Sequence, residues 1–349
     1  MASGKVLKNY ARHVAFLTRE TYESAHEHRN AANERVPSTG GSVAEEAPDL
    51  QPPGRSGDRG ADGSGSNRRS AAGRIYLDAV VSTKRAVQAF WDDAACGETY
   101  AKSDDPIEAF EAHRATRYEL EPFIPGFAKF EEATGLQVLE IGVGMGADHV
   151  RFAQAGPARL VGLDLTPRAV TLTRERAAGL GVDATLFVGD AEHLAFPDHV
   201  FDLVYSWGVL HHSPDTQATL REVRRVLRPG GVARIMVYHR ASIVGALLWV
   251  RYGLGRGRLT MRLDDVYGAY LESPGTKAYA PKEATAMLGE AGFSTVSTSV
   301  ELSIGDLLQG AAGQRHEGVL LRLARRTWPR SIIRRFGHRF GLFLLIEAR

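Results

Sequence analysis

Two adjacent histidines, His211 and His212, lie near the end of the stretch YSWGVLHHSPD at residues 205–215. An imidazole titrates near neutral pH, so either ring could serve as a general base that accepts a proton from a reacting group. Neighbouring histidines could also bind a metal ion, or could pack at the end of a strand. A zinc site would require further cysteine or histidine ligands, and the sequence has no such cluster nearby.

The overall composition predicts a soluble enzyme rather than a nucleic-acid-binding protein. The 349 residues are 44% hydrophobic and 24% charged, and the formal net charge is only +2. The single cysteine, Cys96, excludes an internal disulfide framework. The start of the chain lacks the apolar core of a signal peptide, and the apolar run IVGALLWV at 243–250 is too short to cross a bilayer. A cytoplasmic location is therefore expected.

The chain divides into four regions by composition. Residues 1–35 are predicted to be an N-terminal helical extension, because apolar residues recur there at helical spacing. Residues 36–74 are rich in Gly, Ser and Pro and are predicted to be a disordered linker. We expect residues 75–134 to form helices that cover an active site. Residues 135–349 should form the ligand-binding domain, with insertions at 239–280 and 305–340.

After Gly135, short β-rich runs alternate with helical patterns. Strands are predicted at 137–141, 159–164, 184–189, 201–206 and 231–238, and helices at 146–155, 167–179 and 215–227. Such alternation predicts an α/β fold with a parallel, doubly wound sheet. The segments STVSTSVEL and LFLLIEAR near the end of the chain are predicted to be a sixth and a seventh strand.

The run VLEIGVGMGADHV at 138–150 is typical of a strand, a glycine turn and the start of a helix. Gly142, Gly144 and Gly146 let the backbone turn tightly and let a ligand approach without a Cβ in the way. Asp164 ends the next strand, where an acidic residue can bind ribose hydroxyls. These features fit a dinucleotide site and an adenosyl-methionine site equally, and an ordinary tight turn also remains open.

The next part of the chain distinguishes the two ligands. Gly189-Asp190-Ala191 follows the third strand, where the acid can accept a hydrogen bond from an adenine amino group. YSWGVLHHSPD follows, and RRVLRPGG at 224–231 precedes the fifth strand. In order and spacing these elements resemble a class I S-adenosylmethionine-dependent methyltransferase of the small-molecule, type 11/25-like branch. The resemblance is strong over residues 130–240.

The resemblance implies a Rossmann-like seven-stranded sheet, with six parallel strands and the last one antiparallel, and a helical lid insertion. It also implies S-adenosyl-L-methionine as the cofactor. The implied cofactor-binding residues are Glu140, Gly142, Gly144 and Gly146 for the methionine part, Asp164 for the ribose, Leu165, Asp190 and Ala191 for the adenine, and Ser206 and Trp207 near the sulfonium. The three acids have simpler alternatives. Glu140 could only tie down the neighbouring loop, Asp164 could be the N-cap of the next helix, and Asp190 could be an acid in a surface turn.

In the resembled family, the substrate enters over the carboxyl ends of the strands, so residues 75–133 and 239–280 should cover it. Trp91, Tyr100 and Tyr238 are candidates for this substrate pocket, with core packing as the simpler alternative for each. His212 matches a position where the family commonly has a histidine. Some relatives bind a divalent metal through carboxylates beside this histidine. In this chain Gly208 and His211 occupy the corresponding positions, so the carboxylate ligands are missing and no metal is expected. We expect His211 or His212 to act as a base or to position the acceptor.

Two further features limit the function. The stretch SWGV stands where methyltransferases of nucleobase amines have an NPPY-type tetrad, which weakens a role in nucleic-acid methylation. Residues 315–349 contain nine arginines against Glu317 and Glu347. This basic, partly amphipathic segment could lie on an anionic membrane surface. It could equally be an insertion whose arginines are solvated.

The sequence thus predicts an S-adenosylmethionine-dependent methyltransferase that modifies a small molecule, at a hydroxyl oxygen, in specialised or cell-envelope metabolism. One alternative is C- or N-methylation of a lipid-like acceptor at a membrane surface. A second is a non-catalytic interaction protein that binds the cofactor. A third, an NAD(P)-dependent oxidoreductase, is disfavoured by the tail strands and by RRVLRPGG. The oligomeric state stays open.

Overall fold

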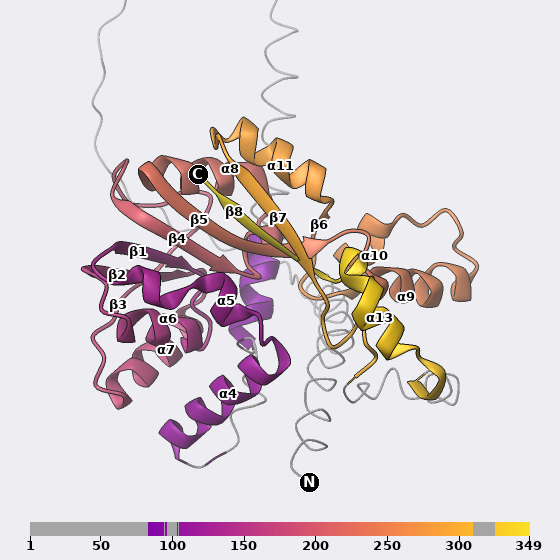
Figure 1. Ribbon diagram of the computed structural model, residues 1–349, viewed down its shortest axis with the longest axis horizontal. Coiled ribbons are helices and arrows are strands. Elements are labelled where there is room, and N and C mark those ends of the chain that lie inside the picture. Colours follow the sequence, from indigo (N-terminus) through magenta and orange to yellow (C-terminus); the bar gives the residue numbers. More distant parts are fainter. Residues whose placement is uncertain (1–82, 94, 96–102, 104, 310–324) are drawn as a thin grey trace, which may run out of the picture.

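Five strands that pair in parallel form the first part of a central sheet in this computed structural model (Figure 1). They are β1 (Gln137–Ile141), β2 (Arg159–Asp164), β3 (Thr185–Val188), β4 (Phe201–Trp207) and β5 (Leu227–His239). The model describes residues 83–93, 95, 103, 105–309 and 325–349. The predicted helical extension, the predicted linker and Tyr100 lie outside these residues.

The described strands follow the order β3-β2-β1-β4-β5-β8-β7. β7 (Val296–Glu301) and β8 (Phe343–Ala348) are the two tail strands predicted from the sequence, and β8 runs antiparallel to both β5 and β7. The α/β prediction and the antiparallel last strand are thus confirmed. The predicted count of seven was wrong, because β6 (Ala278–Tyr279) pairs with the end of β5 as an eighth strand. Two residues are too few to show a strand periodicity.

The described helices largely follow the sequence pattern. Those flanking the parallel strands are α6 (Ala147–Gln154), α7 (Pro167–Gly179) and α8 (Thr216–Val226). Within the predicted helical region 75–134, the chain forms α4 (Pro106–Leu120), α5 (Ile124–Ala128) and the 3-10 turn η2 (Phe130–Ala133). Pro122 lies between α4 and α5, and Lys129, which has left-handed backbone, separates α5 from η2. The segment after β5 contains α9 (Ile243–Tyr252), η4 (Leu254–Arg256) and α10 (Leu263–Tyr270). The other described elements are the 3-10 turn η3 (Leu210–His212), α11 (Pro281–Glu290), α13 (Arg330–Phe336) and η6 (Gly337–Phe340).

Alternate residues of each strand pack on opposite faces of the sheet, as strand geometry requires. Leu139 of β1 belongs to a buried cluster that includes Leu220 of α8 and Leu288 of α11. Its neighbour Val138 belongs to a second cluster, which includes residues of α5 and α6 such as Phe152. The sheet is therefore covered on both faces, and only the ends of its strands can open to a ligand.

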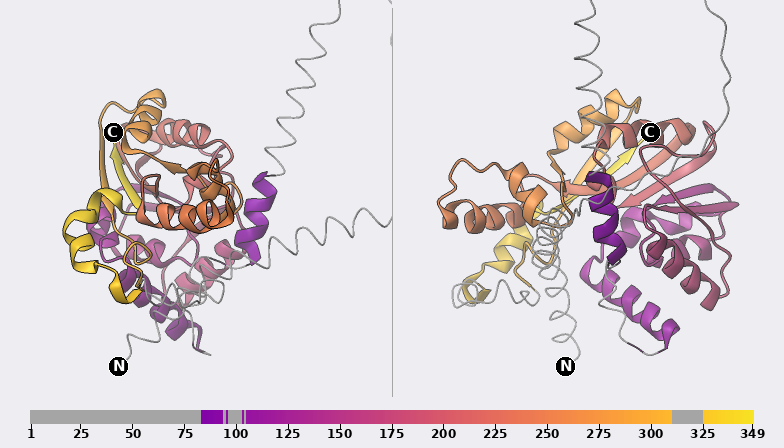
Figure 2. Two further views of the ribbon diagram at one scale, coloured as in Figure 1. Left: turned by 90° about the vertical axis from the view of Figure 1, so that its right-hand side faces the viewer. Right: turned by 180° about the vertical axis from the view of Figure 1, so that it is seen from behind.

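Two sets of helices lie near the carboxyl ends of the parallel strands. A helix at residues 83–93 passes over these ends and can be seen in the right-hand view of Figure 2. Its Gln88 Nε2 donates to the carbonyl of Leu165, at 2.9 Å. α9, α10 and α13 gather at the end of the molecule away from β3 (Figure 1). Within the described part of the chain, none of the helices combines the length and apolar character needed to cross a membrane.

Candidate functional site

A cavity of about 280 Å³ opens at the carboxyl ends of β1, β2 and β4. β1 lies between β2 and β4, so the loops that follow these strands diverge at this point, which is where ligands bind in doubly wound sheets. Most of the predicted site residues line the cavity: Trp91, Glu140, Gly142, Gly144, Asp164, Leu165, Asp190, Ala191, Trp207, His212 and Tyr238. Gly146, Ser206 and His211 are not among the lining residues.

The glycine turn after β1 forms an open backbone cradle. Gly142 and Gly144 have positive φ values of 86° and 53°, a region that other residues adopt only with strain. A Cβ at position 142 would lie 2.1 Å from Val209 Cγ2, whereas nothing lies within 4 Å of a Cβ at position 144. Gly142 thus permits contact with the loop after β4, and Gly144 leaves space in the cavity for a ligand.

Gly146 and Ser206 support the cradle instead of facing the cavity. A Cβ at Gly146 would lie 2.8 Å from Thr173 Cγ2, so the missing side chain lets α6 approach α7. Thr173 Oγ1 in turn donates to the carbonyl of Gly144 at 3.0 Å. Ser206 Oγ donates to the carbonyl of Ile141 at 3.0 Å, which ties the ends of β4 and β1 together.

The Asp164 carboxylate is fixed at the end of β2. Its Oδ2 accepts a hydrogen bond from the Gly144 N–H at 3.1 Å, and its Oδ1 accepts one from the Thr166 N–H at 3.0 Å. Burial raises the pKa of Asp164, although these backbone donors oppose the shift. The N-cap of α7 is Thr166, not Asp164. Asp164 therefore holds the glycine turn and still presents carboxylate oxygens to the cavity.

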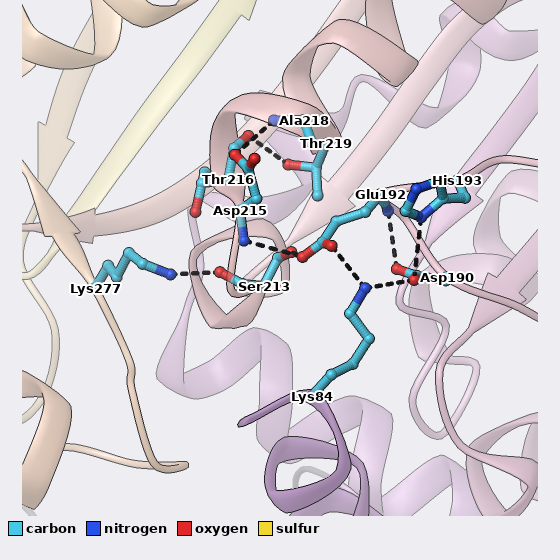
Figure 3. A network of polar contacts seen from close by, with 10 residues as sticks. All are labelled: Lys84, Asp190, Glu192, His193, Ser213, Asp215, Thr216, Ala218, Thr219 and Lys277. Carbon is cyan, nitrogen blue, oxygen red and sulfur yellow. Dashed lines mark hydrogen bonds and ion pairs between the residues drawn. The ribbon is translucent and has the colours of Figure 1, made fainter. Parts of the chain in front are cut away.

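Asp190 lies in the turn after β3 and contacts the helix at 83–93. Lys84 Nζ is 2.5 Å from Asp190 Oδ2 and 2.6 Å from Glu192 Oε2 (Figure 3). Partial burial acts to raise the pKa of Asp190, but the Lys84 contact outweighs it and the pKa is lowered. The predicted adenine-binding acid is thus ionised and paired with a cation from the covering helix.

Two buried carboxyl groups on the cavity wall have raised pKa values. Burial raises the pKa of Glu140 to about 7, although His149 Nδ1 lies 2.9 Å from its Oε2. Burial also raises the pKa of Glu121 to about 7, despite the attraction of Arg117. Arg117 and Asp148 form an ion pair at 2.7 Å close to these groups, and this pairing lowers the pKa of Asp148 against the effect of burial.

These features fit the cofactor that the resemblance implies. The open space at Gly144 lets a ligand approach the protein backbone closely. Asp164 at the end of β2 suits a ribose diol, and the turn at Asp190 and Ala191 suits the edge of an adenine ring. Glu140, at the opposite side of the glycine turn, suits an ammonium group. The three carboxylates are therefore hydrogen-bond acceptors placed to suit the methionine, ribose and adenine parts of S-adenosylmethionine in turn.

His212 reaches the cavity with one nitrogen anchored. Its Nδ1 lies 2.8 Å from Ser273 Oγ and 3.1 Å from Thr276 Oγ1. Thr276 Oγ1 donates its own proton to the carbonyl of Ser273 at 2.7 Å, so it is an acceptor for an Nδ1–H of His212. Nε2 is buried and has no hydrogen-bond partner among the described residues, and Glu272 Oε2 lies 3.3 Å from that nitrogen.

His211 is fully buried behind His212. Its ring centroid lies 4.2 Å from that of His212 and 4.3 Å from that of Tyr238. Neither of its ring nitrogens has a hydrogen-bond partner among the described residues. Burial, reinforced by His212 and Lys277, lowers the pKa of His211 well below its ordinary value. His211 is therefore a neutral ring that packs beneath the cavity wall.

The wall around His212 is largely apolar. Trp207, Tyr238 and Phe343 line it with ring centroids about 6 Å apart, and Leu271 lies on the same wall. The Trp91 ring meets the His212 ring edge-on, with centroids 5.3 Å apart. A molecule placed against this wall would meet mainly apolar side chains, near His212 and Glu272.

Among the described residues, two groups of side chains could hold a metal ion. Ligand atoms of His211, His212 and Glu272 lie within 4.8 Å of one another, as do those of Asp190, Glu192 and His193. In the second group, Lys84 already contacts both carboxylates. The expectation that the protein binds no metal stays a prediction.

Several site residues were not identified from the sequence: Lys84, Arg117, Glu121, Asp148, Glu192 and Glu272. All are charged residues in helices or loops where solvated side chains are also common. Glu272 in particular lies in the insertion after β5, and only the fold brings it to His212. No spacing in the sequence links the two.

The chain was compared with known protein families and curated proteins. Residues 138–231 match the family described as "Methyltransferase domain". The chain is 32% identical over 147 residues to 27-O-demethylrifamycin SV methyltransferase of Amycolatopsis mediterranei, which covers 40% of this chain and 54% of that protein. It is 35% identical over 145 residues to fatty-acid O-methyltransferase of Mycolicibacterium smegmatis, which covers 40% and 52%.

Other matches are more partial. The chain is 32% identical over 143 residues to phosphoethanolamine N-methyltransferase 1 of Arabidopsis thaliana, covering 40% of this chain and 28% of that protein. It thus spans about half or less of the length of these curated relatives. A solved S-adenosylmethionine-dependent methyltransferase from Mesorhizobium loti aligns with 65% of this chain and 97% of that one, at 20% identity and a TM-score of 0.44.

Proposed function

Because residues 138–231 match the family described as "Methyltransferase domain", we propose that this protein is an S-adenosylmethionine-dependent methyltransferase that transfers a methyl group to a hydroxyl oxygen of a small, largely apolar molecule. The observation that carries the proposal is the place of His212 on a largely apolar cavity wall, with Glu272 Oε2 3.3 Å from its unpartnered Nε2. A base at this position is useful when the nucleophile must lose a proton, as a hydroxyl does.

When bound, S-adenosylmethionine supplies a methyl group that is already activated by a cationic sulfur. The protein then has to align the acceptor, exclude water and remove the acceptor's proton. Aromatic side chains such as Trp207 and Tyr238 supply the dry wall. His212 Nε2 would accept the hydroxyl proton as the acceptor oxygen bonds to the methyl carbon, while the sulfur–carbon bond would break and S-adenosylhomocysteine would leave. The Glu272 carboxylate stabilises the positive charge on the imidazole, while Thr276 keeps the ring in place.

The acceptor class follows from the wall around His212. Trp207, Tyr238, Phe343 and Leu271 favour a molecule with an extended apolar or aromatic body. Two relatives support oxygen as the methylated atom, because their names specify O-methylation of a rifamycin and of a fatty acid. A setting in specialised or cell-envelope metabolism is consistent with acceptors of this kind.

A labelled-methyl screen tests the proposal. Purified protein is incubated with methyl-labelled S-adenosylmethionine and a panel of apolar alcohols and phenols, each matched with its O-blocked analogue. We expect label in at least one free hydroxyl compound and none in its blocked analogue. S-adenosylhomocysteine binding without label in any acceptor would instead support the non-catalytic, cofactor-binding alternative.

A second candidate is methylation of a lipid-like acceptor at a membrane surface. Ile332 and Phe336 of α13 and Phe340 of η6 are 61%, 71% and 52% exposed, beside Arg334 and Arg335. Exposed apolar residues among arginines favour contact with an anionic lipid surface. Co-sedimentation with phosphatidylglycerol vesicles tests this candidate. Binding that is lost in Phe336→Ser would support it, and equal binding to neutral vesicles would oppose it.

A further inference from the structure

The Glu192 carboxylate lies in the turn after β3 and joins three parts of the molecule (Figure 3). Its side chain is only 4% exposed. Oε2 contacts Lys84 Nζ at 2.6 Å, while Oε1 accepts hydrogen bonds from the Asp215 N–H at 3.0 Å and from Ser213 Oγ. Glu192 does not itself line the cavity. Any effect on catalysis would therefore pass through its partners.

Those partners belong to the two halves of the proposed site. Lys84 comes from the helix at 83–93 and also contacts Asp190, the predicted adenine-binding acid. Ser213 follows His212 directly, and Asp215 is the N-cap of α8. The carboxylate thus holds the chain immediately after the proposed base.

The opposite side of the histidine loop is held by a second lysine. Lys277 Nζ donates to the carbonyl of Ser213, and the Lys277 N–H donates to the carbonyl of His211 at 3.1 Å. Lys277 precedes β6, in the same segment as Ser273 and Thr276, which anchor Nδ1 of His212. The loop is consequently fixed between Glu192 on one side and residues 273–277 on the other.

We infer that Glu192 is a positioning residue, which sets the place of His212 and links it to the covering helix through Lys84. The buried carboxylate accepts hydrogen bonds from three donors and so holds the loop in one position. Removing it leaves the Asp215 N–H and the Lys84 ammonium without their shared acceptor. Lys84 is well suited to this link. Its burial opposes the charged form, but hydrogen bonds to Asp190 and Glu192 raise its pKa, so it stays charged.

The inference predicts different kinetic effects for the two acids that share Lys84. In Glu192→Gln, kcat should fall about tenfold, because small displacements of a catalytic group are costly. The affinity for S-adenosylhomocysteine should change less than threefold. In Asp190→Asn, the KM for S-adenosylmethionine should rise more than kcat falls. Lys84→Met should show both effects, and Lys84→Arg, which keeps the cation, should recover most of the kcat.

Glu222→Gln is the matched control. Glu222 Oε2 accepts from the Leu194 N–H of the same turn at 2.7 Å, but it pairs with Arg225 and not with the histidine loop. Its kcat should stay within twofold of the wild-type value. Thermal unfolding of every variant distinguishes a variant that has lost its fold from one in which only His212 is displaced. Should Glu192→Gln fail to fold, Ser213→Ala removes one donor of the same link and is expected to lower kcat threefold or more.

The kinetic part of this test rests on the proposed function, so a readout without turnover is included. The imidazole Cε1–H signal of His212 is identified by its absence in His212→Ala. We expect this NMR signal to move in Glu192→Gln and to stay in place in Glu222→Gln, even if no acceptor is found. An unmoved His212 signal in Glu192→Gln would overturn the inference. So would a wild-type kcat, or a loss of S-adenosylhomocysteine affinity as large as that of Asp190→Asn.

Discussion

The Oε2 atom of Glu272 lies 3.3 Å from Nε2 of His212, on the cavity wall that faces the acceptor. The carboxylate comes from the segment after α10 and the imidazole from the loop after β4. Their approach places a carboxylate beside the ring that we propose as the base. Under the proposed function, His212 is the reactive ring and His211 packs behind it.

The first prediction concerns this pair of residues. His212→Ala should lower kcat by about 100-fold, the lower end of the usual contribution of general acid–base catalysis. Glu272→Gln should lower kcat about tenfold, because the imidazolium loses its counter-charge. Steady-state kinetics with the best acceptor checks both values. Glu290→Gln, an exposed carboxylate at the end of α11, serves as the control. Full activity in His212→Ala would exclude the base.

The second prediction concerns protons released on cofactor binding. Burial raises the pKa of Glu140 to about 7. An ammonium group placed beside it would stabilise the carboxylate and lower that pKa, so binding near pH 6 to 7 should release a proton. The affinity should therefore increase as the pH rises toward 7 and level off above it. Calorimetry of S-adenosylhomocysteine binding in buffers of different ionisation enthalpy measures the release.

Two matched variants identify the carboxyl group that releases this proton. Burial also raises the pKa of Glu121 to about 7, yet Glu121 follows α4 and has no part in the predicted methionine contacts. Glu140→Gln should abolish the release, whereas Glu121→Gln should retain it. The opposite pattern would show that the ammonium group binds elsewhere.

The third prediction separates two glycines of the cradle. Gly142→Ala places a Cβ against Val209 and also strains a backbone with φ of 86°, so it should destabilise the fold by about 2 kcal/mol or more. Gly144→Ala meets no neighbour and should cost about 1 kcal/mol, from backbone strain alone. Its Cβ enters the ligand space, so cofactor affinity should fall. Urea unfolding and S-adenosylhomocysteine titration test the two effects. Equal stability losses would contradict the assignment.

The fourth prediction concerns metal ions. Dialysis against EDTA should leave turnover unchanged, because proton removal by His212 requires no metal. Added Zn²⁺ should inhibit, since it would compete for Nε2 of His212 and for Glu272. Activity that disappears with the chelator and returns with one divalent metal would show that His211, His212 and Glu272 form a metal centre instead.

The sequence predicted the parallel half of the fold closely, because its strands are short apolar runs bounded by glycine and charged residues. β1 and β2 have the predicted bounds, and β4 ends one residue later than predicted. β5 begins at Leu227, four residues before its predicted start, because Phe201 of β4 pairs with Leu227 across a register shift. β6 was missed, since two residues pair only through the position of their neighbours.

The cofactor side was also more predictable than the acceptor side. Glycine turns and acids at strand ends follow from local chain geometry, and Gly142, Asp164 and Asp190 all lie on the cavity. Glu272 and Lys84 reach the site from segments that are far apart in the sequence, so only tertiary packing reveals them. Ser206 and Gly146 lie near the site, but Ser206 donates to the Ile141 carbonyl and Gly146 makes room for the Thr173 side chain, a distinction that residue type alone does not make.

The most direct test of the central claim is to locate the transferred methyl group. A product made with deuterated-methyl S-adenosylmethionine is examined by mass spectrometry and NMR, for the wild type and for His212→Ala. We predict a deuterated methyl on oxygen in the wild-type product and about 100-fold less of it with His212→Ala. A methyl on carbon or nitrogen, or no transfer by protein that binds S-adenosylhomocysteine, would contradict the claim.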